Sequence, residues 1–175
     1  GIVFRQSGQL DNALEANDNA VRLAESTGDS GLIAPALAGL AEIHVAMEEF
    51  ELAVHEATRA MEMAEQAGDP LVAAEANRIL ALALIPRREL HRALKAVTSA
   101  RETAVTYQSR LLEGESTAAL ALVLRAMRRE VESESWRDIA HRIFAELHAD
   151  GFRDDFDRLW DGEHGPERKK RAWEG

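Results

Sequence analysis

Residues 40–64, LAEIHVAMEEFELAVHEATRAMEMA, decide the fold of this chain. Apolar and small residues recur every three or four positions on both sides of Glu48 and Glu49, which predicts two amphipathic helices. A link this short makes the two helices antiparallel. Ala53 and Ala60 allow neighbouring helix axes to lie close together, because almost no side chain separates them. We therefore expect an all-α protein built from helical hairpins.

The same pattern returns every 40 residues, which indicates a repeat protein. Gly28-Asp29 recurs as Gly68-Asp69, and Gln108-Ser109 takes the same place once more. The positions that follow also return in step: Leu40, Ala41 and His44; Leu80, Ala81 and Leu84; Leu120, Ala121 and Leu124. A register kept at so many positions predicts a stack of similar hairpins.

Helix boundaries are marked by short signals. In the second unit we expect helices over about 31–47 and 50–67, from the apolar spacing. Asp69 can accept from free amides at the next helix start, and Pro70 fits the first helical position. Gly28 and Gly68 can adopt the left-handed conformation that closes the preceding helix.

Residues 40–64 resemble a tetratricopeptide repeat. The resemblance rests on Leu40-Ala41, on His44 in the place of a large residue between helices, on Phe50 at the turn, and on the two alanines. Residues 7–24, SGQLDNALEANDNAVRLA, are similar to the second half of such a repeat. The likeness covers about residues 1–127 and implies a right-handed α-solenoid. HEAT-like repeats of similar length are the alternative.

The 40-residue spacing is similar to a long-helix variant found in bacterial regulators, such as maltose-activator-like transcription factors and kinase- or cyclase-linked sensor proteins. We expect repeats over 1–131, divided as 1–28, 29–68, 69–108 and the first helix of a last unit at 109–131. Residues 132–162 are expected to form capping helices, and residues 163–175 a charged tail or linker.

The register is expected to be lost after Met127. Ser133 or Ser135 would begin a helix closed by Gly151, and a second apolar stripe would end at Gly162. All three tryptophans lie in the last 40 residues. This aromatic face either covers the final hairpin or docks a partner.

Composition excludes several functions. There are 31 acidic and 21 basic residues, so the net charge of −10 disfavours direct nucleic-acid binding. The chain lacks cysteine, which excludes disulfides and thiolate metal sites. No apolar run approaches the roughly 18 residues of a membrane span, and we expect a cytoplasmic protein. The basic run in PERKKRAWEG, residues 166–175, is expected to be a solvated tail or linker; a nuclear-type signal or phosphate contact is the alternative.

Catalytic and metal-binding patterns are not found. No two of the six histidines have the three- or four-residue spacing that places two imidazoles on one helix face. Asp150, Asp154, Asp155 and Asp157 lack the alternating ligands and glycine of a calcium loop. We therefore predict that the chain is not an enzyme and holds no cofactor.

The resemblance implies that the first helices of successive repeats line a concave binding face. The predicted surface consists of Arg5, Glu42, Val45, Glu75, Arg78, Leu82, Ile85, Leu122 and Arg125. Its apolar members would form the floor. Arg78 and Arg125 would pair either with acidic groups of a ligand or with Glu42, Glu75 and Glu115 on neighbouring helices.

Such a groove suits an amphipathic helix or an extended segment of a partner protein, and self-association into a homodimer is the alternative. Our first hypothesis is a protein-interaction scaffold within a larger bacterial regulatory protein. The alternative is a sensor domain that binds a small effector and relays the signal to an attached output domain.

Overall fold

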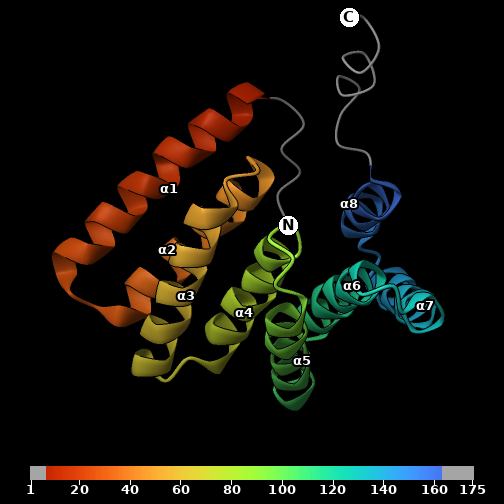
Figure 1. Cartoon of the computed structure of the whole chain (residues 1–175). Helices are drawn as coiled ribbons and strands as arrows, with labels where there is room; N and C mark the ends of the chain where they lie inside the picture. The colour runs from red at the N-terminus through yellow and green to blue at the C-terminus, as the bar shows by residue number, and fades with distance from the viewer. Residues whose placement is uncertain (1–6, 163–175) are drawn as a thin grey trace, which may run out of the picture.

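A computed structural model describes residues 7–162 of the chain, and side chains from residue 10 onward. This part contains eight helices and no strand (Figure 1). The helices are α1 (Ser7–Thr27), α2 (Ser30–Ala46), α3 (Phe50–Ala67), α4 (Pro70–Leu84), α5 (Leu90–Thr106), α6 (Arg110–Ala126), α7 (Glu130–Glu146) and α8 (Asp150–Asp161). Each helix packs against the next in the sequence. The predicted all-α solenoid is therefore confirmed.

The even-numbered and odd-numbered helices form two layers. Contacts join α2 to α4, α4 to α6 and α6 to α8, whereas α1, α3, α5 and α7 make no such contacts with one another in the described part. The stack therefore curves, with the even-numbered helices on its inner, concave side and the odd-numbered helices on its outer side (Figure 1).

The 40-residue spacing continues to the last helix. Helices α2, α4, α6 and α8 begin at residues 30, 70, 110 and 150, and helices α3, α5 and α7 begin at 50, 90 and 130. The expected loss of register after Met127 is wrong. Ser133 lies inside α7 and does not cap it, and Gly151 is the second residue of α8.

Two predicted features of the C-terminal part have different outcomes. The expectation that α8 ends at Gly162 is confirmed, since Gly162 has a φ of 69°. The predicted boundary between residues 131 and 132 falls in the first turn of α7. The assignment of residues 132–162 as a cap stays a prediction, and the predicted tail at 163–175 lies outside the described residues.

The predicted start of α4 is confirmed, and α2 begins with an equivalent aspartate. The Asp69 carboxylate accepts from the backbone N–H groups of Leu71 at 3.2 Å and Val72 at 3.1 Å, and Pro70 is the first residue of α4. The Asp29 carboxylate accepts from the N–H of Gly31 at 2.8 Å. These acceptors satisfy amides that have no partner within the helix.

A left-handed residue occurs every 20 residues, at each turn between helices. Gly28 and Gly68 adopt it as predicted, with φ of 69°. The other turns use residues with a side chain, at φ between 52° and 62°: Glu48, Arg88, Gln108, Arg128 and His148. Because the left-handed conformation is unfavourable for such residues, these turns carry strain that the glycine turns avoid.

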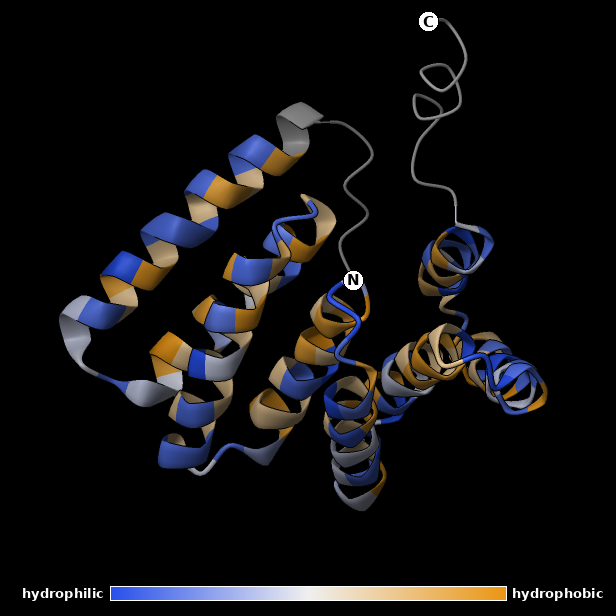
Figure 2. Ribbon diagram, in the orientation of Figure 1, coloured by the Kyte–Doolittle hydropathy of each residue, from blue (hydrophilic) through white to orange (hydrophobic). Residues whose placement is uncertain are grey.

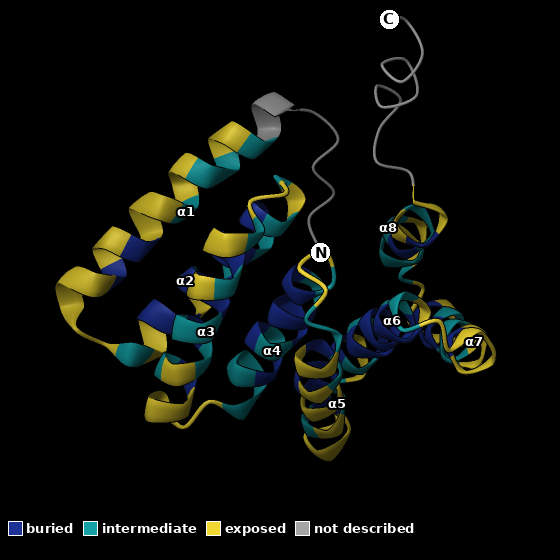
Figure 3. Ribbon diagram, viewed as in Figure 1, coloured by how far each residue is buried: buried dark blue, intermediate teal, exposed yellow. Residues whose placement is uncertain are grey.

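Alanine forms much of the core. Ala53, Ala57, Ala60 and Ala64 of α3 have no exposed surface, and the corresponding part of α5 is equally buried. Figure 2 shows hydrophobic residues concentrated where helices face one another, and Figure 3 shows that the same positions are buried. The small side chains allow close helix packing, as the sequence predicts.

None of the described helices combines the length and the apolar character needed to cross a membrane.

Candidate functional site on the concave face

The predicted binding residues lie on three helices of the concave layer. Glu42 and Val45 are on α2, Glu75, Arg78 and Leu82 are on α4 with Ile85 directly after it, and Leu122 and Arg125 are on α6. Arg5 lies outside the described residues. The site is therefore built from residues of α2, α4 and α6, whose contacts place them side by side.

Arg78 is the centre of this face. Its side chain is buried, and one of its terminal nitrogens, Nη2, donates to Glu42 Oε1 of α2 at 3.0 Å. The same nitrogen lies 3.8 Å from Glu115 Oε1 of α6. Of the two alternatives from the sequence, pairing with carboxylates on neighbouring helices is therefore what the structure shows. Arg78 links three concave helices.

Three carboxylates surround this guanidinium, and the pKa values of two of them, Glu42 and Glu75, move in opposite directions. Burial raises the pKa of Glu75, and the nearby charges of Glu42 and Glu115 raise it further, while Arg78 opposes both effects. Burial also raises the pKa of Glu42, but attraction and the hydrogen bond from Arg78 outweigh it and leave that pKa lowered.

Apolar side chains also lie on α2 and at the C-terminal end of α4. Val45, Leu82 and Ile85 are half-buried, and each packs against the main core while part of its surface stays exposed. The N-terminal and central parts of the concave face therefore combine partly accessible apolar surface with the three carboxylates around Arg78.

The C-terminal end of the predicted surface is occupied by α8. Leu122 packs against the buried cluster that includes Phe156 and Trp160 of this helix. The Arg125 guanidinium donates to the backbone carbonyl of Trp160 and lies over the Trp160 ring, 4.6 Å from its centroid. Arg125 therefore serves to hold α8.

The sequence predicts the aromatic stripe of α8 but places Arg125 on the open surface. A signal for the contact is present in the sequence, because Arg125 and Trp160 are complementary as a cation–π pair. Arg125 and Trp160 are 35 positions apart, and a prediction that ends the register at Met127 does not relate them.

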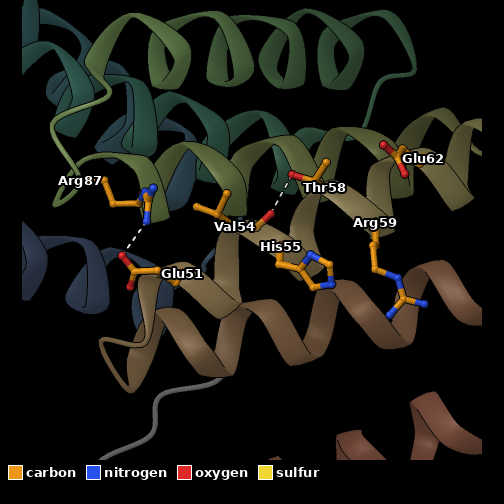
Figure 4. A pocket seen from close by; sticks show the side chains of 7 residues that line it. All are labelled: Glu51, Val54, His55, Thr58, Arg59, Glu62 and Arg87. Atoms are coloured by element: carbon orange, nitrogen blue, oxygen red, sulfur yellow. Dashed lines mark hydrogen bonds and ion pairs between the residues drawn. The ribbon is translucent and has the colours of Figure 1, made fainter.

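An open cleft of about 470 Å³ lies along the outer surface of α3 (Figure 4). It is lined by Glu51, Val54, His55, Thr58, Arg59, Glu62 and Arg87. Arg87 pairs with Glu51 at 2.6 Å, and Arg59 pairs with Glu25 of α1 at 2.9 Å. Glu51, Arg59 and Arg87 are therefore already paired within the chain.

A second open cleft, of about 410 Å³, lies between α1, α2 and α3. His44 Nδ1 is 2.5 Å from Glu56 Oε2 at its base. Burial raises the pKa of Glu56, although the hydrogen bond and charge of His44 oppose the shift. His44 occupies the buried position between helices that the resemblance predicts. Neither cleft was identified from the sequence, because no motif marks the residues that line it.

Metal-binding geometry is not found in the part of the chain that the structure describes: no group of three or more histidine, aspartate or glutamate side chains could hold an ion there.

The N-terminal part of the chain is similar to a known family. The family model for the tetratricopeptide repeat matches residues 1–66, which include α1, α2 and nearly all of α3. This match supports a tetratricopeptide repeat in the N-terminal part of the solenoid. No curated protein matches the chain.

Proposed function

We propose that this chain is a non-catalytic scaffold that binds a partner protein or peptide along its concave face. Tetratricopeptide repeats generally mediate protein–protein interactions, and a repeat of this family matches residues 1–66. The observation that carries the proposal is the half-exposed apolar surface of Val45, Leu82 and Ile85 beside the Arg78 cluster.

The partner segment is an amphipathic helix or an extended chain. Its apolar side chains pack on Leu82 and its neighbours, and its polar side chains face the acidic part of the groove. Helix-in-groove recognition of this kind buries one apolar face of the bound segment. Residues of α6 contribute less than the sequence predicts, because α8 covers Leu122 and Arg125.

A peptide-display selection against the full chain, followed by calorimetry on the best binders, tests this proposal. Leu82→Glu is expected to weaken binding by at least about tenfold, or about 1.4 kcal/mol. The matched control is Leu52→Glu, because Leu52 is an exposed leucine of α3 in the outer layer. This control is expected to leave the affinity within about twofold.

Thermal melting of both variants shows whether the fold survives each substitution. If folded Leu82→Glu binds as tightly as the unmodified chain, or if Leu52→Glu causes the same loss, the binding site lies elsewhere. The aromatic side of α8 would then be the next surface to test.

The context of a larger, cytoplasmic bacterial regulatory protein is part of the proposal, supported by the 40-residue spacing. The alternative of a small-effector sensor would be favoured by an enclosed pocket, whereas the two clefts described above are open. Self-association is a further possibility. Light scattering across a range of concentrations tests it, and a constant monomer mass would exclude a homodimer.

A further inference from the structure

Three arginines lie where the concave helices α4 and α6 end. Arg125 is in the last turn of α6, and Arg88 and Arg128 lie in the turns that follow α4 and α6. The backbone N–H of Arg88 donates to the carbonyl of Ile85 at 3.0 Å, so this turn directly follows the apolar residues of the groove. These three residues, called here the arginine rim, therefore border the groove that the proposed function assigns to a partner.

The charges of the arginine rim have no partner carboxylate in the part of the chain that the structure describes. The Arg125 guanidinium donates to a backbone carbonyl, that of Trp160. The side chains of Arg88 and Arg128 make no hydrogen bond or ion pair with a described residue, and all three arginines are exposed. Their positive charge is therefore accessible to a bound segment.

The excess of positive charge is local to these two turns. Residues 85–92 and 125–132, which are equivalent in the repeat, contain six arginines and three glutamates. The equivalent residues 45–52 contain three glutamates and no arginine or lysine. Glu89 and Glu132 already pair with Arg92 and Arg129. In a chain with a net charge of −10, this cationic surface favours a partner that supplies negative charge at this end of the groove.

We propose that the arginine rim binds acidic side chains of the segment that occupies the concave groove. This inference rests on the proposed function and names the chemistry of the partner. Apolar side chains of the segment pack on Leu82 and Ile85, and aspartate or glutamate side chains beside them pair with Arg88 and Arg128. Guanidinium groups suit this role because they can donate two parallel hydrogen bonds to one carboxylate.

The repeat sets the spacing of these acidic side chains. Arg88 and Arg128 are equivalent residues of adjacent repeats, and the helices that precede them, α4 and α6, are in contact. Packed helix axes lie about 8–10 Å apart. Two to four residues of an extended chain span about 7–14 Å. Acidic residues separated by two to four positions are therefore expected to reach both arginines.

A charge-swap selection with the full chain tests the inference. One peptide-display library is selected against the unmodified chain and against Arg88→Glu/Arg128→Glu. Binders of the unmodified chain are expected to be enriched at least about threefold in aspartate and glutamate, and binders of the variant in lysine and arginine. Glutamate is compatible with these turns, because Glu48 has a φ of 62° at the equivalent position. Arg125 is left unchanged because it also holds α8.

Calorimetry on the best acidic binder measures the effect on affinity. Arg88→Glu/Arg128→Glu is expected to weaken binding at least about tenfold, and lysines in place of the acidic residues of the peptide should restore it. The matched control is Lys95→Glu/Arg142→Glu, because both residues are exposed cations of the outer helices α5 and α7. It is expected to change the affinity less than about twofold. Salt at about 1 M, where the screening length falls to about 3 Å, should reduce the difference between the variants.

Several outcomes would overturn the inference. These are binders without acidic enrichment, equal losses of affinity for the control and the arginine variant, or equally tight binding of a single-stranded oligonucleotide with the net charge of the peptide. Binding that is weakened by Leu82→Glu but not by Arg88→Glu/Arg128→Glu would refute the role of the arginine rim and leave the proposed function intact. A selection that yields no binder of the unmodified chain would refute both.

Discussion

Two hairpins of the solenoid hold side chains of very different size at equivalent positions. In the α4–α5 hairpin, Ala74 and Ala104 belong to one small buried cluster. Forty residues later, in the α6–α7 hairpin, Gly114 and Phe144 take these positions. A Cβ placed on Gly114 would lie 3.0 Å from the Phe144 ring and 2.8 Å from Ile143 Cγ2. The glycine therefore makes room for the phenylalanine.

The phenylalanine at residue 144 changes how the α6–α7 hairpin packs against the following helix, α8. Phe144 stacks on Phe152 of α8 with ring centroids 6.2 Å apart, and Phe156 meets Trp160 edge-on at 5.8 Å. An alanine at residue 144 could not reach these rings. The helix spacing is thus common to both hairpins, whereas the side-chain volumes decide whether the following helix packs through alanines or through aromatic rings.

Phe144→Ala is expected to have the largest effect on stability. The side chain is 2% exposed, so its removal leaves a cavity and should lower the free energy of unfolding by about 3–5 kcal/mol. Urea denaturation followed by circular dichroism measures this loss. A decrease below about 1 kcal/mol would mean that the aromatic contacts between α7 and α8 contribute little.

The double variant Gly114→Ala/Phe144→Ala tests whether these two residues form a unit. It recreates the alanine pair of the α4–α5 hairpin, so it should be more stable than the sum of the single changes predicts, by about 0.5–3 kcal/mol. Strictly additive effects would show that the exchange of volumes is not coupled.

Ala93→Leu probes the alanine-packed hairpin from the opposite direction. Ala93 has no exposed surface, so a larger side chain should overpack the contact of α5 with its neighbours and destabilise by about 1–3 kcal/mol. Ala53→Leu at the equivalent position of α3 should lower the stability by a similar amount. The control is Ala20→Leu on the exposed side of α1, which should leave the melting temperature nearly unchanged. Unchanged melting of both core variants would contradict the packing described here.

The residues with positive φ at the turns allow a comparison with a smaller expected effect on stability. Arg88→Gly should increase the free energy of unfolding by about 0.5–1 kcal/mol, because glycine adopts this conformation without steric cost. Gly68→Ala should decrease it by a similar amount, although no atom would obstruct the new methyl group. Equal melting temperatures for the two variants would show that the turns are not strained.

Two carboxylates of the Arg78 cluster should respond to pH with opposite signs. Since the pKa of Glu42 is lowered in the folded state, its ionised form stabilises the fold above the unfolded pKa, and this contribution is lost as pH falls through the folded pKa. Glu42→Gln should therefore be less stable than the unmodified chain at pH 7 and equal to it in acid.

Glu75 should behave in the reverse way. Its pKa is raised in the folded state, so its ionised form at pH 7 reduces stability, and the unmodified chain recovers as pH falls through the raised pKa. Glu75→Gln should be slightly more stable at pH 7, with the difference vanishing at lower pH. Melting curves at several pH values measure both variants, and shifts of the same sign would contradict the charge balance of the cluster.

The sequence predicts the hairpins well where its signals are local. Asp69 and Pro70 mark a helix start, and Gly28 and Gly68 mark helix ends, through chemistry that acts within one turn. The prediction fails after Met127 because Phe144 and Ser133 replace alanines of the earlier repeats, which obscures a register that the backbone keeps. The concave positions of Glu42, Arg78 and Leu82 follow from the register, but the burial of Arg78 between two carboxylates depends on distances that spacing alone does not supply.

The contact of the even-numbered helices with one another, and the lack of such contact between the odd-numbered helices of the described part, gives the molecule a preferred direction of bending. Outer helices can separate or approach without breaking contacts between them, whereas inner helices are joined by side chains such as Arg78. We therefore expect the spacing between outer helices to vary more than the spacing between inner helices. Loss of the Arg78 ion pairs would weaken the contacts between the inner helices and reduce the curvature of the stack.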